Sequence, residues 1–527
     1  MVNESDCKII WGIAALGHDA SISVIKESHI VFAAHSERYS RIKNDDRLND
    51  QIINEALQHG YPDKIVWHEK PYLKKVRQAM AGQWSEVFNK EVLPERYLKK
   101  FLPKLPPIEY ALHHKSHAAA GAYTSPFNEA TVVVLDAIGE FNTCSIWKYN
   151  FPNTLKKIET SNYPSSFGLL YSAFTQRCGL KPNEEEYILM GMAAYGEPKY
   201  AEQIKKDFIR SMTPLKLKQN VHAGIGDYLP EASTEDLASS IQAVAEEFVV
   251  KYCEYAMDKT GVKDLVYMGG VALNCVANTK LLDVCESIWI MPNPGDSGNS
   301  LGAALLGQNF ISLWPGPFLG TDIPGIYPVK DVIKELETNQ ICGVAHGKAE
   351  FGPRALGNRS LLADPRGQDI KDKVNAIKKR QKFRPFAPVI LAEELENYFE
   401  INTNQTPYMQ FTAKAKPDTI KNFPAIVHAD GTARVQTVTA WDNPGLRRIL
   451  ELWFEKTKCP MLLNTSLNIR GEPLVNTEQD ALNFQNKYGI KVISRWVKRL
   501  REIEVDPEGL EALRIQTQRE KNKKWKN

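Results

Sequence analysis

Short apolar runs separated by polar turns mark the start of the chain and recur after residue 130. Runs of strand length lie at 9–14, 20–25, 30–34, 131–135 and 144–149. The turn Gly17-His18-Asp19 joins the first two, and Asp136 with a Gly139-containing loop joins the last two. Alternation of this kind predicts strands with tight connections. Because the arrangement occurs twice, we predict a duplicated, two-lobed α/β domain with a cleft between its lobes.

Later segments predict the remaining main elements. The pattern indicates strands at 265–268, 287–291, 432–438 and 461–466, and helices at 113–123, 235–258 and 301–306. A stripe in the longest of these helices is predicted to be core: Leu237, Ile241, Val244, Phe248, Val249 and Tyr252. The proline- and glycine-rich stretch 315–328 predicts a linker. We therefore expect a domain at 1–330, a second at 331–505 and a basic tail at 506–527.

Length and composition narrow the class of protein. With 527 residues, 43% hydrophobic and 24% charged, the chain fits a globular protein of two or three domains. A formal net charge of +3 gives no general argument for nucleic acid or membrane partners. The first residues lack a basic and apolar leader, and no stretch is long enough to span a membrane. A cytoplasmic location without a membrane partner is the resulting expectation.

Cysteine usage agrees with that expectation. The eight cysteines include no C-x-x-C pair and suggest reduced, mostly buried thiols. Cys275 follows a glycine-rich segment, so it is either a buried thiol or a nucleophile.

The segment His113-His-Lys-Ser-His117 has the spacing of a metal-binding helix. Residues four apart share one helix face, so both imidazoles can reach one ion. Asp136 and Asp296 each follow a predicted strand, where open α/β sheets place ligands. Two imidazoles and one or two carboxylates suit a divalent transition metal, iron or zinc rather than calcium. The alternatives are surface histidines and a helix-capping carboxylate at Asp296.

Two further segments favour anion binding. Gly269-Gly270 follow an apolar strand and lead toward Asn274 and a helix, which permits close approach of a nucleotide. After residue 330 the chain becomes rich in glycine and arginine, and it contains Arg354, Lys378, Arg384, Arg434 and a polar turn at Ser466. Arginine forks and backbone amides suit phosphate and carbamate oxygens. A solvated basic face is the alternative.

These segments together resemble the O-carbamoyltransferase family of the NodU/CmcH type over residues 8 to 485. The resemblance rests on the following motifs, in this order: Gly17-His18-Asp19; His113-His-Lys-Ser-His117; Asn183 to Gly196; Gly269-Gly270-Val-Ala-Leu-Asn274; Asp296-Ser-Gly298; Glu350-Phe-Gly-Pro-Arg-Ala-Leu-Gly-Asn-Arg-Ser360; Phe383-Arg-Pro-Phe-Ala-Pro388; His428-Ala-Asp-Gly-Thr-Ala-Arg434; and Leu463-Asn-Thr-Ser-Leu-Asn468.

The resemblance implies an α/β protein with a two-lobed actin-like (ASKHA) domain followed by a YrdC/Sua-like α/β domain. The second domain would convert carbamoyl phosphate and ATP, with Mg²⁺, to carbamoyl adenylate. Its binding residues would be Arg354, Lys378, Arg384, Arg434 and Ser466, with Lys43 reaching over from the first domain.

The first domain would then transfer the carbamoyl group to a hydroxyl of an acceptor. His113, His117, Asp136 and Asp296 match the ligands of a divalent metal, with iron(II) expected. His18 matches a residue beside the reacting carbonyl, where an imidazole can take the hydroxyl proton. Gly269, Gly270 and Asn274 are the expected nucleotide contacts of this domain. Ile188 departs from the family pattern, because relatives often carry lysine there.

The acceptor is open between a small natural product and a hydroxymethylated pyrimidine in a nucleotide or DNA. The basic tail, with Trp525 among lysines, permits contact with nucleic acid or is simply solvated. The alternative functions are a threonylcarbamoyl-type tRNA-modifying enzyme and a non-catalytic nucleotide-binding protein. A homodimer also stays open.

Overall fold

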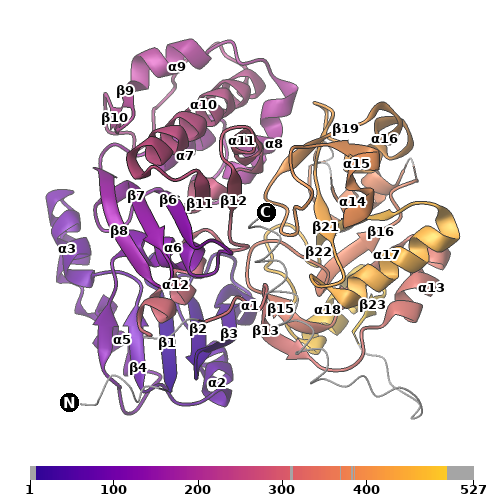
Figure 1. Ribbon diagram of the computed structural model, residues 1–527, viewed down its shortest axis with the longest axis horizontal. Helices are drawn as coiled ribbons and strands as arrows, with labels where there is room; N and C mark the ends of the chain where they lie inside the picture. Colours follow the sequence, from indigo (N-terminus) through magenta and orange to yellow (C-terminus); the bar gives the residue numbers. More distant parts are fainter. Residues whose placement is uncertain (1–7, 309–311, 368, 382–383, 385, 495–527) are drawn as a thin grey trace.

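The fold is that of a mixed α/β protein, shown as a computed structural model in Figure 1. The structure describes residues 8–308, 312–367, 369–381, 384 and 386–494. The predicted tail at 506–527 lies outside the described residues, as do Phe383 and Pro385 of the predicted anion site. None of the helices in the described segments is both long and apolar enough to cross a membrane.

Two five-stranded sheets form the N-terminal part. The first contains β1 (Ile9–Ala14), β2 (Ser21–Lys26), β3 (His29–His35), β4 (Lys64–Trp67) and β5 (Ile108–Tyr110). The second contains β6 (Glu129–Leu135), β7 (Asn142–Asn150), β8 (Thr154–Asn162), β11 (Asp264–Met268) and β12 (Ser287–Trp289).

The two sheets have the same topology. Their strand orders are β3-β2-β1-β4-β5 and β8-β7-β6-β11-β12. In each sheet the first three strands along the chain are antiparallel neighbours, and the last two extend it in parallel. The predicted duplication is therefore confirmed by strand order and direction.

Two helices rich in small residues lie between these sheets. They are α6 (His113–Ala122), which packs on β6 and β11, and α12 (Asn299–Leu306), which packs on β1 and β2. Close packing requires glycine at the contacts. A Cβ on Gly12 would lie 1.9 Å from the Ser300 carbonyl oxygen, and one on Gly302 would lie 1.8 Å from that of Ser116. The backbones of β1, α12 and α6 are thus in direct contact.

Other helices cover the outer faces of the sheets and the loops between strands. In the first lobe they are α1 (Glu37–Ser40), α2 (Asp50–Gln58), α3 (Pro71–Met80), α4 (Trp84–Phe88) and α5 (Pro94–Leu98). The second lobe adds α7 (Phe167–Arg177), α8 (Glu186–Met192), α9 (Ala201–Phe208), α10 (Thr234–Thr260) and α11 (Cys275–Leu281), with the hairpin of β9 (Ile209–Met212) and β10 (Leu215–Leu217). The predicted stripe of α10 is buried, as expected.

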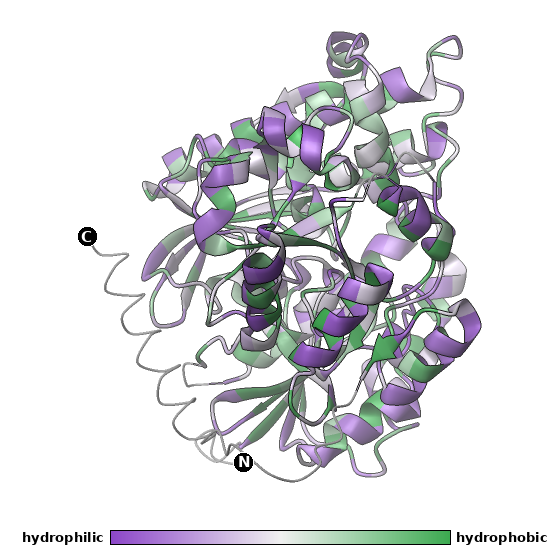
Figure 2. Cartoon of the chain, turned by 90° about the vertical axis from the view of Figure 1, so that its right-hand side faces the viewer, coloured by the Kyte–Doolittle hydropathy of each residue, from purple (hydrophilic) through white to green (hydrophobic). Residues whose placement is uncertain are grey.

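A six-stranded sheet organises the C-terminal third, in the order β21-β17-β22-β16-β14-β23. These strands are β14 (Ile341–Ala345), β16 (Arg359–Ala363), β17 (Ala387–Leu391), β21 (Gln436–Val438), β22 (Met461–Ser466) and β23 (Val492–Ile493). Its helices are α13 (Val329–Asn339), α14 (Ile370–Lys378), α15 (Leu395–Tyr398), α16 (Pro417–Asn422), α17 (Pro444–Thr457) and α18 (Glu478–Tyr488). Figure 2, which looks onto this side, shows both hydrophilic and hydrophobic residues along such helices.

Two expectations differ from the structure here. The predicted linker contains a strand, β13 (Phe318–Ile323), which pairs with β15 (Gly347–Glu350) and lies beside β3. Prolines and glycines on both sides of this strand, and Gly320 within it, concealed it. The single strand predicted at 432–438 is divided between β20 (Thr432–Arg434), which pairs in a small sheet with β18 (Phe399–Glu400) and β19 (Thr412–Ala415), and β21.

The contact between α6 and α12 gives a stability prediction. Gly302→Ala places a methyl group against backbone that has no room to move, so we expect the free energy of unfolding to fall by about 1–3 kcal/mol or more. Urea denaturation measures this. The matched control is Gly191→Ala in α8, where a Cβ meets no described atom within 4 Å. Equal stability of the two variants would contradict the close contact.

Candidate metal centre and anion site

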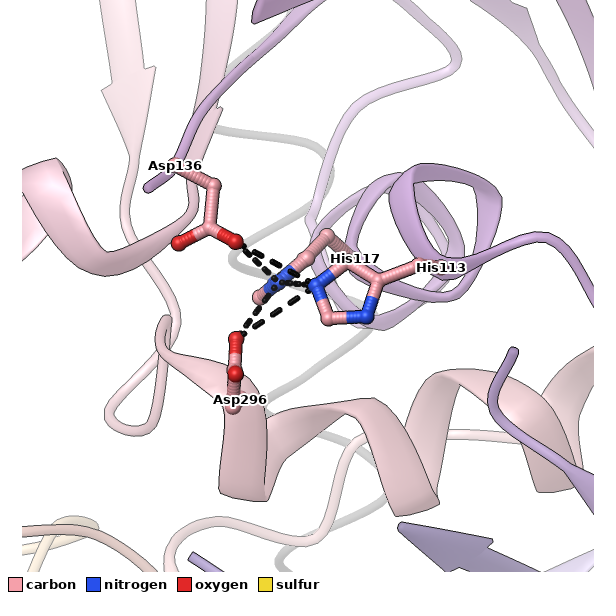
Figure 3. A group of neighbouring side chains, drawn as sticks. All are labelled: His113, His117, Asp136 and Asp296. Atoms are coloured by element: carbon pink, nitrogen blue, oxygen red, sulfur yellow. Dashed lines mark hydrogen bonds and ion pairs between the residues drawn. The ribbon is translucent and has the colours of Figure 1, made fainter. Parts of the chain in front are cut away.

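Four side chains from distant parts of the sequence converge between the two lobes (Figure 3). His113 and His117 come from α6, Asp136 follows β6, and Asp296 begins a short 3₁₀ turn before α12. One ligand atom of each lies within 4.8 Å of the others. The Nε2 atom of His113 is 3.2 Å from Asp136 Oδ2, and that of His117 is 3.3 Å from Asp296 Oδ1. The predicted helix and both strand-end aspartates thus meet at one point.

Neighbouring groups orient these four side chains. The Nδ1 atom of His117 lies 3.1 Å from the Pro294 carbonyl oxygen, which leaves Nε2 facing the cluster. The backbone N–H of Gly270 donates to Asp136 Oδ1 at 3.0 Å. Glu140 accepts the backbone N–H of His113 at 3.1 Å and so fixes the start of α6. Metal ligands are commonly held by such outer contacts.

The chemistry of this set fits a transition-metal ion. The Nε2 atoms of His113 and His117 are 3.2 Å apart. When His117 Nδ1–H donates to the Pro294 carbonyl oxygen, Nε2 is unprotonated and its lone pair points into the cluster. Burial opposes ionisation of Asp296, but the two imidazoles hold its pKa well below the usual range. Two imidazole nitrogens and two ionised carboxylates are ligands that iron and zinc accept. The Asp296 side chain makes no helix-capping hydrogen bond, so the structure does not support its alternative role as a capping carboxylate.

His18 lies at the turn between β1 and β2, close to the cluster. Its Nδ1 is 3.1 Å from Asp19 Oδ2, and its Nε2 is 3.0 Å from the Asn183 carbonyl oxygen. Burial favours the neutral ring, but the hydrogen bond and charge of Asp19 raise the pKa of His18 to about 10. These contacts favour the protonated ring in this arrangement, and the part of His18 beside the reacting carbonyl stays a prediction.

The predicted nucleotide residues of the first domain have structural partners. Gly269 has φ +94°, and a Cβ there would lie 2.1 Å from the Leu135 carbonyl oxygen. Gly270 holds Asp136, as described above. The Asn274 side chain accepts the backbone N–H of Ala277 at 3.1 Å and is hydrogen-bonded to Gln242. Nucleotide binding by these three residues stays a prediction.

A second cluster, of cationic side chains, lies where both lobes meet the C-terminal third. Lys43 and Arg384 approach the same ring, that of Tyr187, with their charged groups 5.2 and 4.9 Å from its centroid. Lys43 follows α1 and Tyr187 belongs to α8, whereas Arg384 comes from the C-terminal third. The structure therefore brings Lys43 to the predicted anion site across the junction.

The other predicted residues of this site lie nearby and repel one another. Burial, followed by repulsion from Arg434 and Arg384, lowers the pKa of Arg354 to about 9. Lys378 is buried and donates from Nζ to Ser466 Oγ at 2.9 Å and Asn468 Oδ1 at 2.7 Å. Within the described part of the chain, no carboxylate forms an ion pair with Arg354, Arg384 or Arg434. Such a set is suited to a multiply charged anion.

Sequence reasoning missed several residues around both clusters. Tyr187, Arg380, Asp19, Asn183 and Glu140 were not among the predicted site residues. Burial and repulsion from Arg384 and Arg434 lower the pKa of Arg380 to about 8, which places it with the cations. Its position between Lys378 and Arg384 in the sequence was a usable signal. The others act through contacts that no local pattern encodes.

Two family models match most of the chain. The model described as "Carbamoyltransferase N-terminus" matches residues 9–305, and "Carbamoyltransferase C-terminus" matches residues 333–496. The first covers both N-terminal sheets and the four-residue cluster, and the second covers the six-stranded sheet.

Individual proteins are similar over nearly the full length. An uncharacterized protein of Synechocystis is 32% identical over 98% of each chain. The nodulation protein NolNO of Sinorhizobium fredii is 29% identical, over 88% of this chain and 76% of its own. The 3'-hydroxymethylcephem-O-carbamoyltransferase of Amycolatopsis lactamdurans is 27% identical, over 90% and 96%. A crystal structure of full-length HypF aligns with a TM-score of 0.32 and 13% identity, over 56% of this chain and 46% of that one, which is too low to define the fold.

The four-residue cluster predicts a bound metal. We expect the protein purified after loading with iron(II) or zinc to carry about one ion per chain at this site, because two imidazoles and two carboxylates converge there. His113→Ala and Asp296→Asn should each lose the ion, as measured by elemental mass spectrometry. His29→Ala, which removes an exposed histidine on β3, should keep it. Equal metal content in all variants would contradict the site.

Proposed function

Because the chain belongs to the carbamoyltransferase family, we propose that it moves a carbamoyl group from carbamoyl phosphate, by way of carbamoyl-AMP, to a hydroxyl of an acceptor. The observation that carries this proposal is the pairing of two clusters of different chemistry. One set of nitrogen and carboxylate ligands lies between the lobes, and one set of mutually repelling cations lies at the junction with the C-terminal third.

In the proposal, the cation cluster performs the activation. Arg354, Arg384 and Arg434 contact the phosphates of ATP and of carbamoyl phosphate, whose charges offset the repulsion among them. Water adds to the carbonyl carbon of carbamoyl phosphate, and inorganic phosphate leaves. An oxygen of the resulting carbamate then attacks the α-phosphorus of Mg²⁺-bound ATP and displaces pyrophosphate. Lys378 and Ser466, already hydrogen-bonded to each other, orient the carbamoyl oxygens, and Lys43 closes the site from the first lobe.

The N-terminal cleft performs the transfer. The acceptor oxygen forms a bond to the carbamoyl carbon, AMP leaves with the bonding pair, and the hydroxyl proton passes to solvent. His113, His117, Asp136 and Asp296 would hold the metal, iron(II) in our proposal, and a divalent ion there supplies Lewis acidity toward the carbonyl or phosphoryl oxygen. His18, as a charged donor, stabilises negative charge that develops near the cluster rather than accepting the acceptor's proton. Gly269, Gly270 and Asn274 contact the adenylate in this proposal.

The finer description of the two parts belongs to the same proposal. We infer that the duplicated N-terminal sheets are an actin-like domain ending near residue 330 and that the following sheet is a YrdC-like domain. The shared 3-2-1-4-5 strand order supports the first inference. The acceptor is a hydroxylated small molecule, with a hydroxymethylated pyrimidine in a nucleotide or DNA as the other candidate. The two alternatives, a tRNA-modifying enzyme and a non-catalytic nucleotide-binding protein, have less support, because both family models are those of carbamoyltransferases.

The division of labour predicts separable half-reactions. Asp296→Asn should retain pyrophosphate release from ATP and carbamoyl phosphate but lose carbamoyl transfer, since it leaves the cation cluster intact. Arg354→Gln should reduce pyrophosphate release by about 100-fold or more, in line with loss of a buried charge-assisted contact. A coupled pyrophosphate assay measures both, with Lys330→Gln, an exposed position on α13, as the control.

Mass spectrometry of the products identifies the acceptor. The protein is incubated with ATP, carbamoyl phosphate, iron(II) and a panel of hydroxylated compounds that includes hydroxymethylcytosine DNA. We expect one acceptor to gain a single carbamoyl group. No consumption of ATP under any condition would overturn the proposed reaction and favour a non-catalytic protein.

A further inference from the structure

Helix α3 is amphipathic in the reverse of the usual sense, with polar side chains toward the protein and apolar ones toward solvent. On its inner side, Lys74 Nζ donates to the Leu16 carbonyl oxygen at 2.9 Å and to Glu69 Oε1 at 2.8 Å, and Arg77 is buried. On its outer side, Tyr72 and Met80 are exposed, Met80 by 78%. Soluble helices normally bury their apolar stripe.

The short helix α4 packs against α3 and also exposes apolar side chains. Trp84 and Phe88 stack with ring centroids 6.2 Å apart, and Phe88 is 74% exposed. Polar contacts hold α4 in place, because Lys75 Nζ donates to the carbonyl oxygens of Val87 and Asn89 at 2.8 Å. We call residues 71–88 the α3–α4 hairpin. Its apolar face consists of Tyr72, Leu73, Val76, Met80, Trp84 and Phe88.

Positive charge is concentrated around this hairpin. Between Lys70 and Lys104 the sequence has nine basic and three acidic side chains, although the whole chain has a net charge of only +3. The rest of the protein is therefore net acidic. Five lysines of this segment are exposed: Lys70, Lys90, Lys99, Lys100 and Lys104. Lys100 forms an ion pair with Glu91 at 3.3 Å. An exposed apolar face with aromatic residues, in a segment rich in exposed lysines, is typical of surfaces that lie in a lipid interface.

The charge also decides between occupants. A second copy meeting this face symmetrically would bring the same lysines together, at a cost in repulsion. An anionic bilayer offers negative charge at its surface and apolar volume beneath, so it matches both features at once. We propose that the α3–α4 hairpin docks the protein on an anionic lipid surface, with the apolar face inserted and the lysines at the headgroups.

The position of the hairpin agrees with docking. In Figure 1, α3 lies at the left edge of the molecule, on the side away from the C-terminal third. Docking there would leave the C-terminal third, which supplies Arg354, Arg384 and Arg434, on the side away from the lipid. The hairpin lies on the bilayer surface and does not span it.

Vesicle co-sedimentation of the full chain tests the proposal. We expect binding to vesicles of phosphatidylglycerol and phosphatidylcholine, weaker binding at high salt, and little binding to phosphatidylcholine alone. The double variant Trp84→Ser with Phe88→Ser should lower the partition coefficient at least about tenfold. The pair Lys99→Glu with Lys100→Glu should lower it as well. Ile326→Ser, which is also exposed but lies outside the hairpin, should bind as the parent does.

Results of two kinds, one from sedimentation and one from light scattering, would overturn this inference. One is no sedimentation of the parent protein with anionic vesicles at low salt, or equal sedimentation of parent and hairpin variants whose thermal unfolding midpoints match. The other is a dimer in light scattering that the Trp84→Ser and Phe88→Ser variant converts to monomers, which would assign the face to a second copy. Because neither readout involves ATP or carbamoyl phosphate, the proposed enzymatic function is tested separately.

Discussion

The contact between α6 and α12 is the constraint on which the metal centre depends. Both helices lie between the N-terminal sheets, and glycine at position 302 lets their backbones touch. His113 and His117 are on α6, and Asp296 stands directly before α12. The distance between the helices therefore sets the distance between histidine and aspartate ligands. A side chain at this contact would separate the ligands as well as destabilise the core.

The junction with the C-terminal third plays the same part for the cation cluster. Arg38 donates to the Gly352 carbonyl oxygen at 2.7 Å, and Arg41 donates to those of Pro473 and Leu474. Arg41 and Asn44 have φ of 60° and 55°, a conformation that costs energy for residues other than glycine. Lys43 lies between them. The strained turn is thus held by contacts across the junction, and it directs Lys43 toward Tyr187 and Arg384.

The two clusters have opposite electrostatic character. The ligand set between the lobes contains two carboxylates, whereas the junction gathers cations whose pKa values burial and mutual repulsion depress. A reaction that begins with phosphates and ends with transfer from a carbonyl group can use both environments in turn. The α3–α4 hairpin differs from both clusters, because its polar side chains contact the rest of the protein and its apolar face is exposed.

The sequence determined those features that depend on local spacing. The interval from His113 to His117 places two imidazoles on one helix face. The apolar runs at 9–34 and 131–149 predicted two sheets of the same kind. The family motifs located Arg354, Lys378, Arg434 and Ser466, whose roles stay proposals. Other features required tertiary structure. Nothing local shows that Gly270 holds Asp136, that β13 within the predicted linker pairs with β15, or that α3 turns its apolar side outward. An apolar stripe has the same period whether it faces core or solvent, so only the packing of neighbouring elements decided its direction.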